Sequence, residues 1–98
     1  MILWRHIKSE GEYWEVGRGL MGSLPVVIYA ARLEGRVWVR AADLFDDGRF
    51  GVVAHSEGSY PATYPLPATF EADLSEVFVL REGDEFIVIP KAEYVEEG

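Results

Sequence analysis

Cysteine is absent from this sequence, and histidine occurs only twice among its 98 residues. Without cysteine the chain can form neither a disulfide, nor a thiolate zinc site, nor a thiolate nucleophile. A metal site would have to combine carboxylates with the two histidines. The sequence therefore predicts that the protein binds no metal ion, and no motif in it indicates another cofactor.

Long apolar runs are also missing. Charges begin soon after Ile2 and Leu3, so the first residues do not match the apolar region of a signal peptide. No run approaches the roughly 18 apolar residues of a membrane-spanning helix. We expect a protein that has no membrane partner and is located in the cytoplasm.

Basic residues are scarce in one half only. Residues 1–49 carry Lys8 and six arginines against seven acids, whereas residues 50–98 carry only Arg81 and Lys91 against ten acids. The formal net charge of −8 thus lies entirely in the second half. Such a field repels phosphate backbones, which disfavours nucleic acid as a partner. The simplest role of the acids is to keep a small sheet protein soluble.

Short runs of strand-forming residues, separated by turn residues, fill most of the chain. The turns are expected at Gly11, Glu34-Gly35, Asp47-Gly48 and Glu82-Gly83-Asp84. The sequence predicts a mainly β fold, either a small SH3-like open barrel or a curled antiparallel sheet. At most one short helical turn is expected, at residues 41–45. The expected strands are residues 2–8, 12–18, 25–33, 36–40, 49–55, 76–81 and 85–91.

A chain of this length predicts one domain, residues 1–98, with one hydrophobic core. Within it we expect a β core at residues 4–45 and a C-terminal β-hairpin at residues 76–90. Between them lies an expected proline-rich loop, residues 56–75, whose tyrosines would close one end of the barrel. The spacing of its prolines does not fit a Pro-x-x-Pro ligand. They are Pro61, Pro65 and Pro67.

The first predicted strand concentrates charge around an indole. Side chains alternate along a strand, so Trp4, His6 and Lys8 share one face and Arg5 lies on the other, with Leu3 and Ile7. We therefore expect Arg5 to point inward. A buried guanidinium needs a carboxylate, and Glu15 or Asp43 would supply it. The outward side chains of His6 and Lys8 are then better placed to contact a ligand.

A second group of candidate residues follows from the same alternation. Trp38 and Arg40 share one face of their strand, and Val37 and Val39 share the other. A tryptophan beside an arginine forms a cation–π pair or lines a shallow groove for a peptide or planar ligand. Further rings, at Tyr13, Trp14 and Tyr29, also lie in the first half of the chain. A binding site is therefore expected in the first half.

The order and spacing of several short motifs resemble the small bacterial DUF1653 domain over about residues 4–45. Ala41 departs from that pattern, in which proline follows the arginine, and Trp14 replaces a tyrosine. The resemblance implies a small β domain and nominates ligand-binding residues, but it implies no activity. The nominated residues, with Trp4 added from the face analysis, are Trp4, Arg5, His6, Lys8, Tyr29, Trp38 and Arg40. The motifs are Arg5-His6-x-Lys8, Trp14-Glu15-Val16, Val26-Val27-Ile28-Tyr29 and Trp38-Val39-Arg40, followed by Phe45.

Two classes of function remain open, and catalysis is the less favoured third. The serines show no nucleophile-elbow context, and the glycines after Gly17 lack the Lys-Ser/Thr of a phosphate loop. The favoured interpretation is a small β-barrel module that binds a peptide, a protein or a small anionic ligand. The alternative is an acidic inhibitor, or nucleic-acid mimic, that binds a basic protein. A homodimer also stays open, because the C-terminal hairpin is apolar on both faces.

Overall fold

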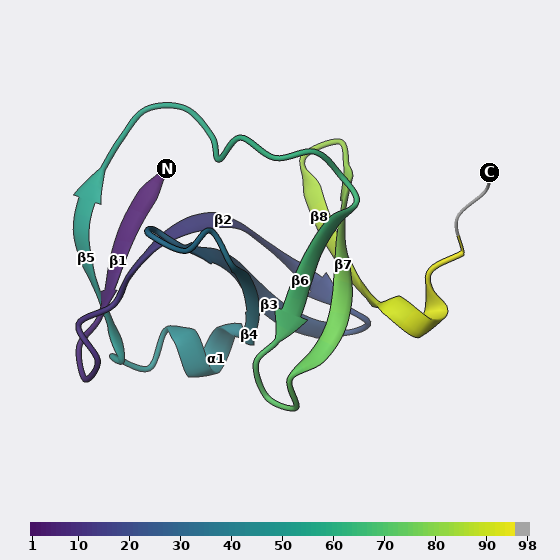
Figure 1. Ribbon diagram of the computed structural model, residues 1–98, viewed down its shortest axis with the longest axis horizontal. Helices are drawn as coiled ribbons and strands as arrows, with labels where there is room; N and C mark the ends of the chain where they lie inside the picture. Colours follow the sequence, from purple (N-terminus) through teal and green to yellow (C-terminus); the bar gives the residue numbers. More distant parts are fainter. Residues whose placement is uncertain (96–98) are drawn as a thin grey trace.

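The computed structural model describes residues 1–95 and is dominated by strands joined by short turns (Figure 1). The prediction of a mainly β fold is confirmed. Helical structure within these residues is confined to a four-residue helix and a 3₁₀ turn. The elements are β1 Ile2–His6, β2 Glu12–Met21, β3 Leu24–Ala31, β4 Val37–Ala41, α1 Ala42–Phe45, β5 Phe50–His55, β6 Leu66–Phe70, β7 Ser75–Glu82, β8 Glu85–Pro90 and η1 Lys91–Glu93.

Six of the strands in the described chain close into a barrel, in the order β3, β4, β6, β7, β8 and β2, with β2 pairing back onto β3. Most neighbours are antiparallel, whereas β4 with β6 and β2 with β8 are parallel. Strands β1 and β5 continue the sheet outward from β2. Closure removes the free edges that the six barrel strands would expose in an open sheet.

Strand β2 belongs to both parts of the sheet. Its first half pairs with β1, and its second half pairs with β8 on the same side. A register shift between Glu15 and Gly17 separates the two halves. Such a bulge bends a strand and increases its twist, which lets one strand change neighbours.

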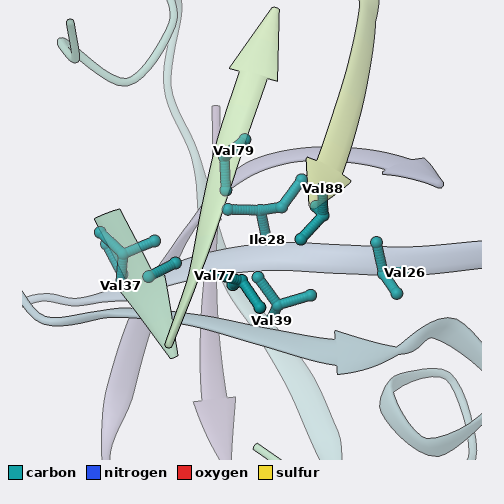
Figure 2. Packing of buried hydrophobic residues seen from close by; sticks show 9 residues of the cluster. Val26, Ile28, Val37, Val39, Val77, Val79 and Val88 are labelled. Carbon is teal, nitrogen blue, oxygen red and sulfur yellow. The ribbon is translucent and has the colours of Figure 1, made fainter. Parts of the chain in front are cut away.

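The hydrophobic core lies on both faces of β3, so the expectation of one core is wrong. Alternate residues of β3 point into the barrel, where they meet β4, β7 and β8 (Figure 2). The intervening residues Val27 and Tyr29 face a second cluster outside the barrel. The barrel cluster is mostly valine: Val26, Ile28, Ala30, Val37, Val39, Ala68, Val77, Val79 and Val88.

The second cluster is aromatic and lies under α1 and β5. Phe45 of α1 stacks on Phe50 of β5, with ring centroids 4.2 Å apart and planes tilted by 12°. The ring of Tyr29 lies 5.4 Å from Phe45 and 5.7 Å from Phe50, centroid to centroid. Trp4 of β1 meets Phe45 edge-on at 5.1 Å. This packing explains why a four-residue helix is stable where isolated helices of that length are not.

The turn predictions hold at three places and differ at two. The helical turn, the reversal at Asp47-Gly48 and the β7–β8 turn at Gly83 are confirmed, with both glycines at positive φ. The connection between β3 and β4 is longer than predicted, because the strands end at Ala31 and restart at Val37. The predicted loop of residues 56–75 contains strand β6.

Pro67 lies inside β6 without breaking a ladder bond. The Glu71 N–H donates to the Val39 carbonyl of β4, so alternate N–H groups of β6 face β4. Strand β4 pairs with β6 only at Thr69 and Phe70. The missing N–H of Pro67 therefore falls where β4 has already diverged, and proline is tolerated there.

Candidate functional site

An open groove of about 770 Å³, which we call the Trp38 groove, lies beside the β3–β4 connection. Strands β1 and β2 form one wall, and the loop after β3 forms the other. Trp38 is half-buried on its lining, and Leu33 is 95% exposed at its rim. The groove is lined by Arg5, Glu10, Gly11, Glu12, Tyr13, Ala31, Arg32, Leu33, Glu34 and Trp38.

Two arginines of the groove share one carboxylate. Arg32 Nη1 donates to Glu12 Oε1 at 2.7 Å, and Arg5 Nη2 donates to Glu12 Oε2 at 3.2 Å. Both arginine side chains stay about half exposed, at 49% and 52%. The Arg32 and Arg5 guanidiniums hold the pKa of the Glu12 carboxyl below its ordinary value. Each guanidinium has five N–H donors, so both keep donors for a further acceptor.

The predicted inward orientation of Arg5 is wrong. Its side chain is exposed and pairs with Glu12, not with Glu15 or Asp43. The opposite face of β1 is the one that packs, because the aromatic cluster under α1 lies on the side of Trp4. Of the residues on the Arg5 face, only Leu3 is buried, at 5% exposed, and Ile7 is exposed.

Contrary to the prediction, the His6 side chain does not face solvent beside Trp4. It contacts Phe50, and also Ser9 of the β1–β2 turn. Its ring meets Phe50 edge-on, with centroids 4.9 Å apart. Its Nδ1 atom lies 2.9 Å from Ser9 Oγ and accepts the Ser9 N–H at 3.2 Å. Lys8 is exposed in the same turn. The two residues that we expected to contact a ligand thus lie outside the Trp38 groove.

Tyr29 belongs to the aromatic cluster, and Trp4 and Arg40 pack against it. Tyr29 is 3% exposed, and burial raises the pKa of its phenol to about 12. The Trp4 indole Nε1 is buried without a hydrogen-bond partner among the described residues. The predicted face shared by Trp38 and Arg40 is confirmed, since Val37 and Val39 are buried in the barrel.

The Arg40 side chain is 11% exposed and makes one ion pair, from Nη2 to Glu71 Oε1 at 3.0 Å. Its guanidinium carbon lies 5.1 Å from the Phe50 ring centroid. Its Nε and Nη1 atoms are buried without a partner in the described chain. Arg40 thus connects the Phe50 ring of the aromatic cluster to the Glu71 carboxylate, and it does not line the groove.

A cation–π pair separates the Trp38 groove from a second, smaller depression. The Arg36 guanidinium carbon lies 4.3 Å from the Trp38 ring centroid. Arg36 itself lines a groove of about 490 Å³ where β4 and β6 diverge, together with Pro67 and Lys91. One face of the Trp38 ring is therefore covered by the Arg36 guanidinium.

The Trp38 groove brings together only two of the nominated residues, Arg5 and Trp38. Sequence reasoning missed Glu12, Arg32 and Leu33. The sequence did contain an indication that Leu33 is exposed. It is a large apolar residue between charged ones in a connection between two strands, where no hydrophobic core lies close enough to bury it. Pairing between Glu12 and Arg32 required the β2–β3 register, which places Tyr13 opposite Ala31.

Comparisons of the chain with family models, curated proteins and solved structures give no match. The resemblance to DUF1653 therefore stays a prediction. No helix within residues 1–95 is long and apolar enough to span a membrane. The same residues contain no group of three or more potential metal-ligating side chains.

Proposed function

We propose that the protein is a small β-barrel binding module whose Trp38 groove holds a segment of a peptide or protein partner. The observation that carries the proposal is that Leu33, 95% exposed, and the Trp38 ring line the same groove together with two half-exposed arginines. Apolar side chains left in solvent next to polar rims are typical of interaction sites.

The lining supports a ligand that combines an apolar side chain with an anionic group. The rings of Trp38 and Tyr13 offer flat apolar surface, which suits an aliphatic or aromatic side chain. The free donors of Arg5 and Arg32 suit a carboxylate or phosphate. Glu12 holds both guanidiniums in place before a ligand arrives, which reduces the entropy lost on binding.

Binding fits the lining better than catalysis does. Among the groove residues, Glu12 has both carboxylate oxygens engaged by arginines and a lowered pKa, which makes it a poor general base. The His6 ring packs against Phe50 and does not line the groove. We also propose that the protein is located in the cytoplasm. A chain without cysteine forms no disulfide, so its folding does not require an oxidising compartment.

The acidic-inhibitor alternative receives less support from the placement of the carboxylates. It requires one stripe of acids, but Glu10, Glu12 and Glu34 line the Trp38 groove and Asp46 and Asp47 follow α1, outside the segment from β6 to η1 that carries most acids of the second half. Several are also neutralised by ion pairs within the described chain. These are Glu12, Glu15, Asp46, Asp47, Glu71 and Glu76.

The test is selection of a random linear peptide library displayed on phage, followed by measurement of peptide affinity. We expect the selected peptides to bind the wild type and to lose at least tenfold in affinity to Leu33→Glu or Arg32→Glu. Leu74→Glu is the matched control, because Leu74 is 66% exposed in the β6–β7 turn. Peptides that bind all variants equally, or a selection without enrichment, would overturn the proposal.

A further inference from the structure

Strand β5 ends the sheet. It pairs with β1 along one side, and no other strand in residues 1–95 pairs with its outer edge. Figure 1 shows β5 at one end of the long axis of the molecule. The unpaired N–H and C=O groups of such an edge are a template for another strand.

The composition of β5 leaves this edge unprotected. Its sequence, FGVVAH, contains no Asp, Glu, Lys, Arg or proline. Val52 and Val53 are 50% and 43% exposed. Soluble proteins usually protect edge strands with lysine, proline or inward charges, and here only the register shift opposite Leu3 and Trp4 serves that purpose.

The residues that flank β5 identify the strand that would pair with it. Arg49 precedes the strand with its side chain 54% exposed; its Nε pairs with Asp47 at 2.9 Å, which leaves its terminal Nη groups for a further acceptor, and Glu57 follows the strand. When two such strands pair antiparallel about a two-fold axis, Arg49 of each copy approaches Glu57 of the other. Parallel pairing would bring like charges together. The charge pattern is therefore self-complementary in the antiparallel arrangement.

The net charge of the chain does not oppose this contact. Most acids of the second half lie on the elements from β6 to η1, and Figure 1 shows η1 at the end of the long axis opposite β5. The molecule extends 40 Å along that axis. Repulsion across such a distance is screened, because the Debye length is about 8 Å at physiological ionic strength.

We infer that β5 is a homodimerisation edge, at which two copies pair their β5 strands antiparallel and continue one sheet across both molecules. The inference is independent of the Trp38 groove. The contact consists of the strand backbones and the exposed valines Val52 and Val53. Because this interface is small, the dimer is reversible and its population depends on concentration.

Sedimentation equilibrium over a wide range of protein concentration is the first test. We expect a monomer–dimer equilibrium whose dissociation constant rises at least tenfold in Val52→Lys, since a lysine on the edge opposes pairing. Leu74→Lys is the control, because it adds the same charge to an exposed leucine of the barrel turn. A monomer at every concentration would overturn the inference.

Charge reversal provides the second test. Arg49→Glu and Glu57→Arg should each weaken the dimer, and the double variant R49E/E57R should restore it. Circular dichroism of each variant verifies that the monomer is folded. A dimer that is insensitive to these changes but lost on substitution of Phe78 or Ile87 would place the interface on the outer face of β7 and β8, and would refute the inference.

Discussion

Gly19 of β2 lies directly against the backbone of Phe86 of β8. A Cβ atom on Gly19 would overlap the Phe86 carbonyl oxygen and the carbonyl carbon next to it. The two residues are also register partners in the parallel pairing of β2 with β8. Because this pairing closes the barrel, the absence of a side chain at position 19 is a condition of closure.

Gly19→Ala should therefore destabilise the fold by about 2 kcal/mol or more, as overpacking against rigid backbone does. Chemical denaturation with a fluorescence readout measures the change. Gly51→Ala is the matched control, because a Cβ atom added at Gly51 would meet no heavy atom within 4 Å and the φ of this residue is not left-handed. Equal stability of the two variants would show that β8 can shift away from β2 at no cost.

Loss of Glu71 should destabilise the protein by leaving the Arg40 charge without its ion pair. Arg40 is 11% exposed and Glu71 is 36% exposed, so we expect Glu71→Gln to cost about 1–2 kcal/mol, less than a fully buried pair costs. Thermal unfolding of the variant measures the effect.

The control for this pair is Arg40→Met combined with Glu71→Gln. Methionine keeps the contact with Phe50 and removes a guanidinium whose Nε and Nη1 have no partner in the described chain. The double variant should therefore be more stable than Glu71→Gln alone. A double variant that is less stable than either single one would assign Arg40 a stabilising role beyond the Glu71 pair.

Acidification should weaken the fold through Glu12. Arg32 and Arg5 hold the pKa of this carboxyl below its ordinary value of 4.5 in the folded state. A depressed folded pKa stabilises the protein above the unfolded value, and this contribution is lost as the pH falls through the folded value. Stability should begin to fall below about pH 4.5.

Denaturant titrations between about pH 3 and pH 7 test this dependence. Glu12→Gln should make the loss of stability on acidification smaller. Glu93→Gln, which changes an exposed acid of η1, is the control and should leave the wild-type dependence in place. The same dependence in both variants would contradict a role for Glu12.

Alkaline stability should depend on Tyr29. Burial raises the pKa of this phenol from 10.0 to about 12. The raised folded pKa gives a contribution that is complete below pH 10 and is lost as the pH approaches 12. Tyr29→Phe removes the ionising group, so its alkaline unfolding midpoint, followed by ultraviolet absorbance, should lie higher than that of the wild type. An unchanged midpoint would mean that another group controls alkaline unfolding.

The predictions from sequence were best where the signal was local. The β7–β8 hairpin needed only two apolar runs and a glycine turn, and Gly83 has the positive φ that glycine adopts readily in such a turn. The helical turn before Phe45 and the reversal at Asp47-Gly48 were also readable from a few adjacent residues. By contrast, strand β6 could not be predicted, because Pro67 normally interrupts a strand. Whether a proline is acceptable there depends on where β4, a strand distant in the sequence, stops pairing with β6.

The faces of β1 show why the candidate site was only partly predicted. Alternation correctly separates Arg5 from Trp4, but it does not say which face is covered. The answer depends on α1 and β5, whose rings Phe45 and Phe50 come from a later part of the chain. The groove likewise depends on the β2–β3 register, which brings Glu12 within reach of Arg32.

Strand β3 contacts both hydrophobic clusters and pairs with β2 and β4, its neighbours in sequence. These contacts close short loops, whereas the pairing of β2 with β8 joins segments far apart in the chain. Short-range contacts cost less loop entropy and form earlier. We therefore expect the three-stranded meander from β2 to β4 to nucleate folding and barrel closure to come last. Substitutions at Ile28 should slow folding, and those at Gly19 should mainly accelerate unfolding.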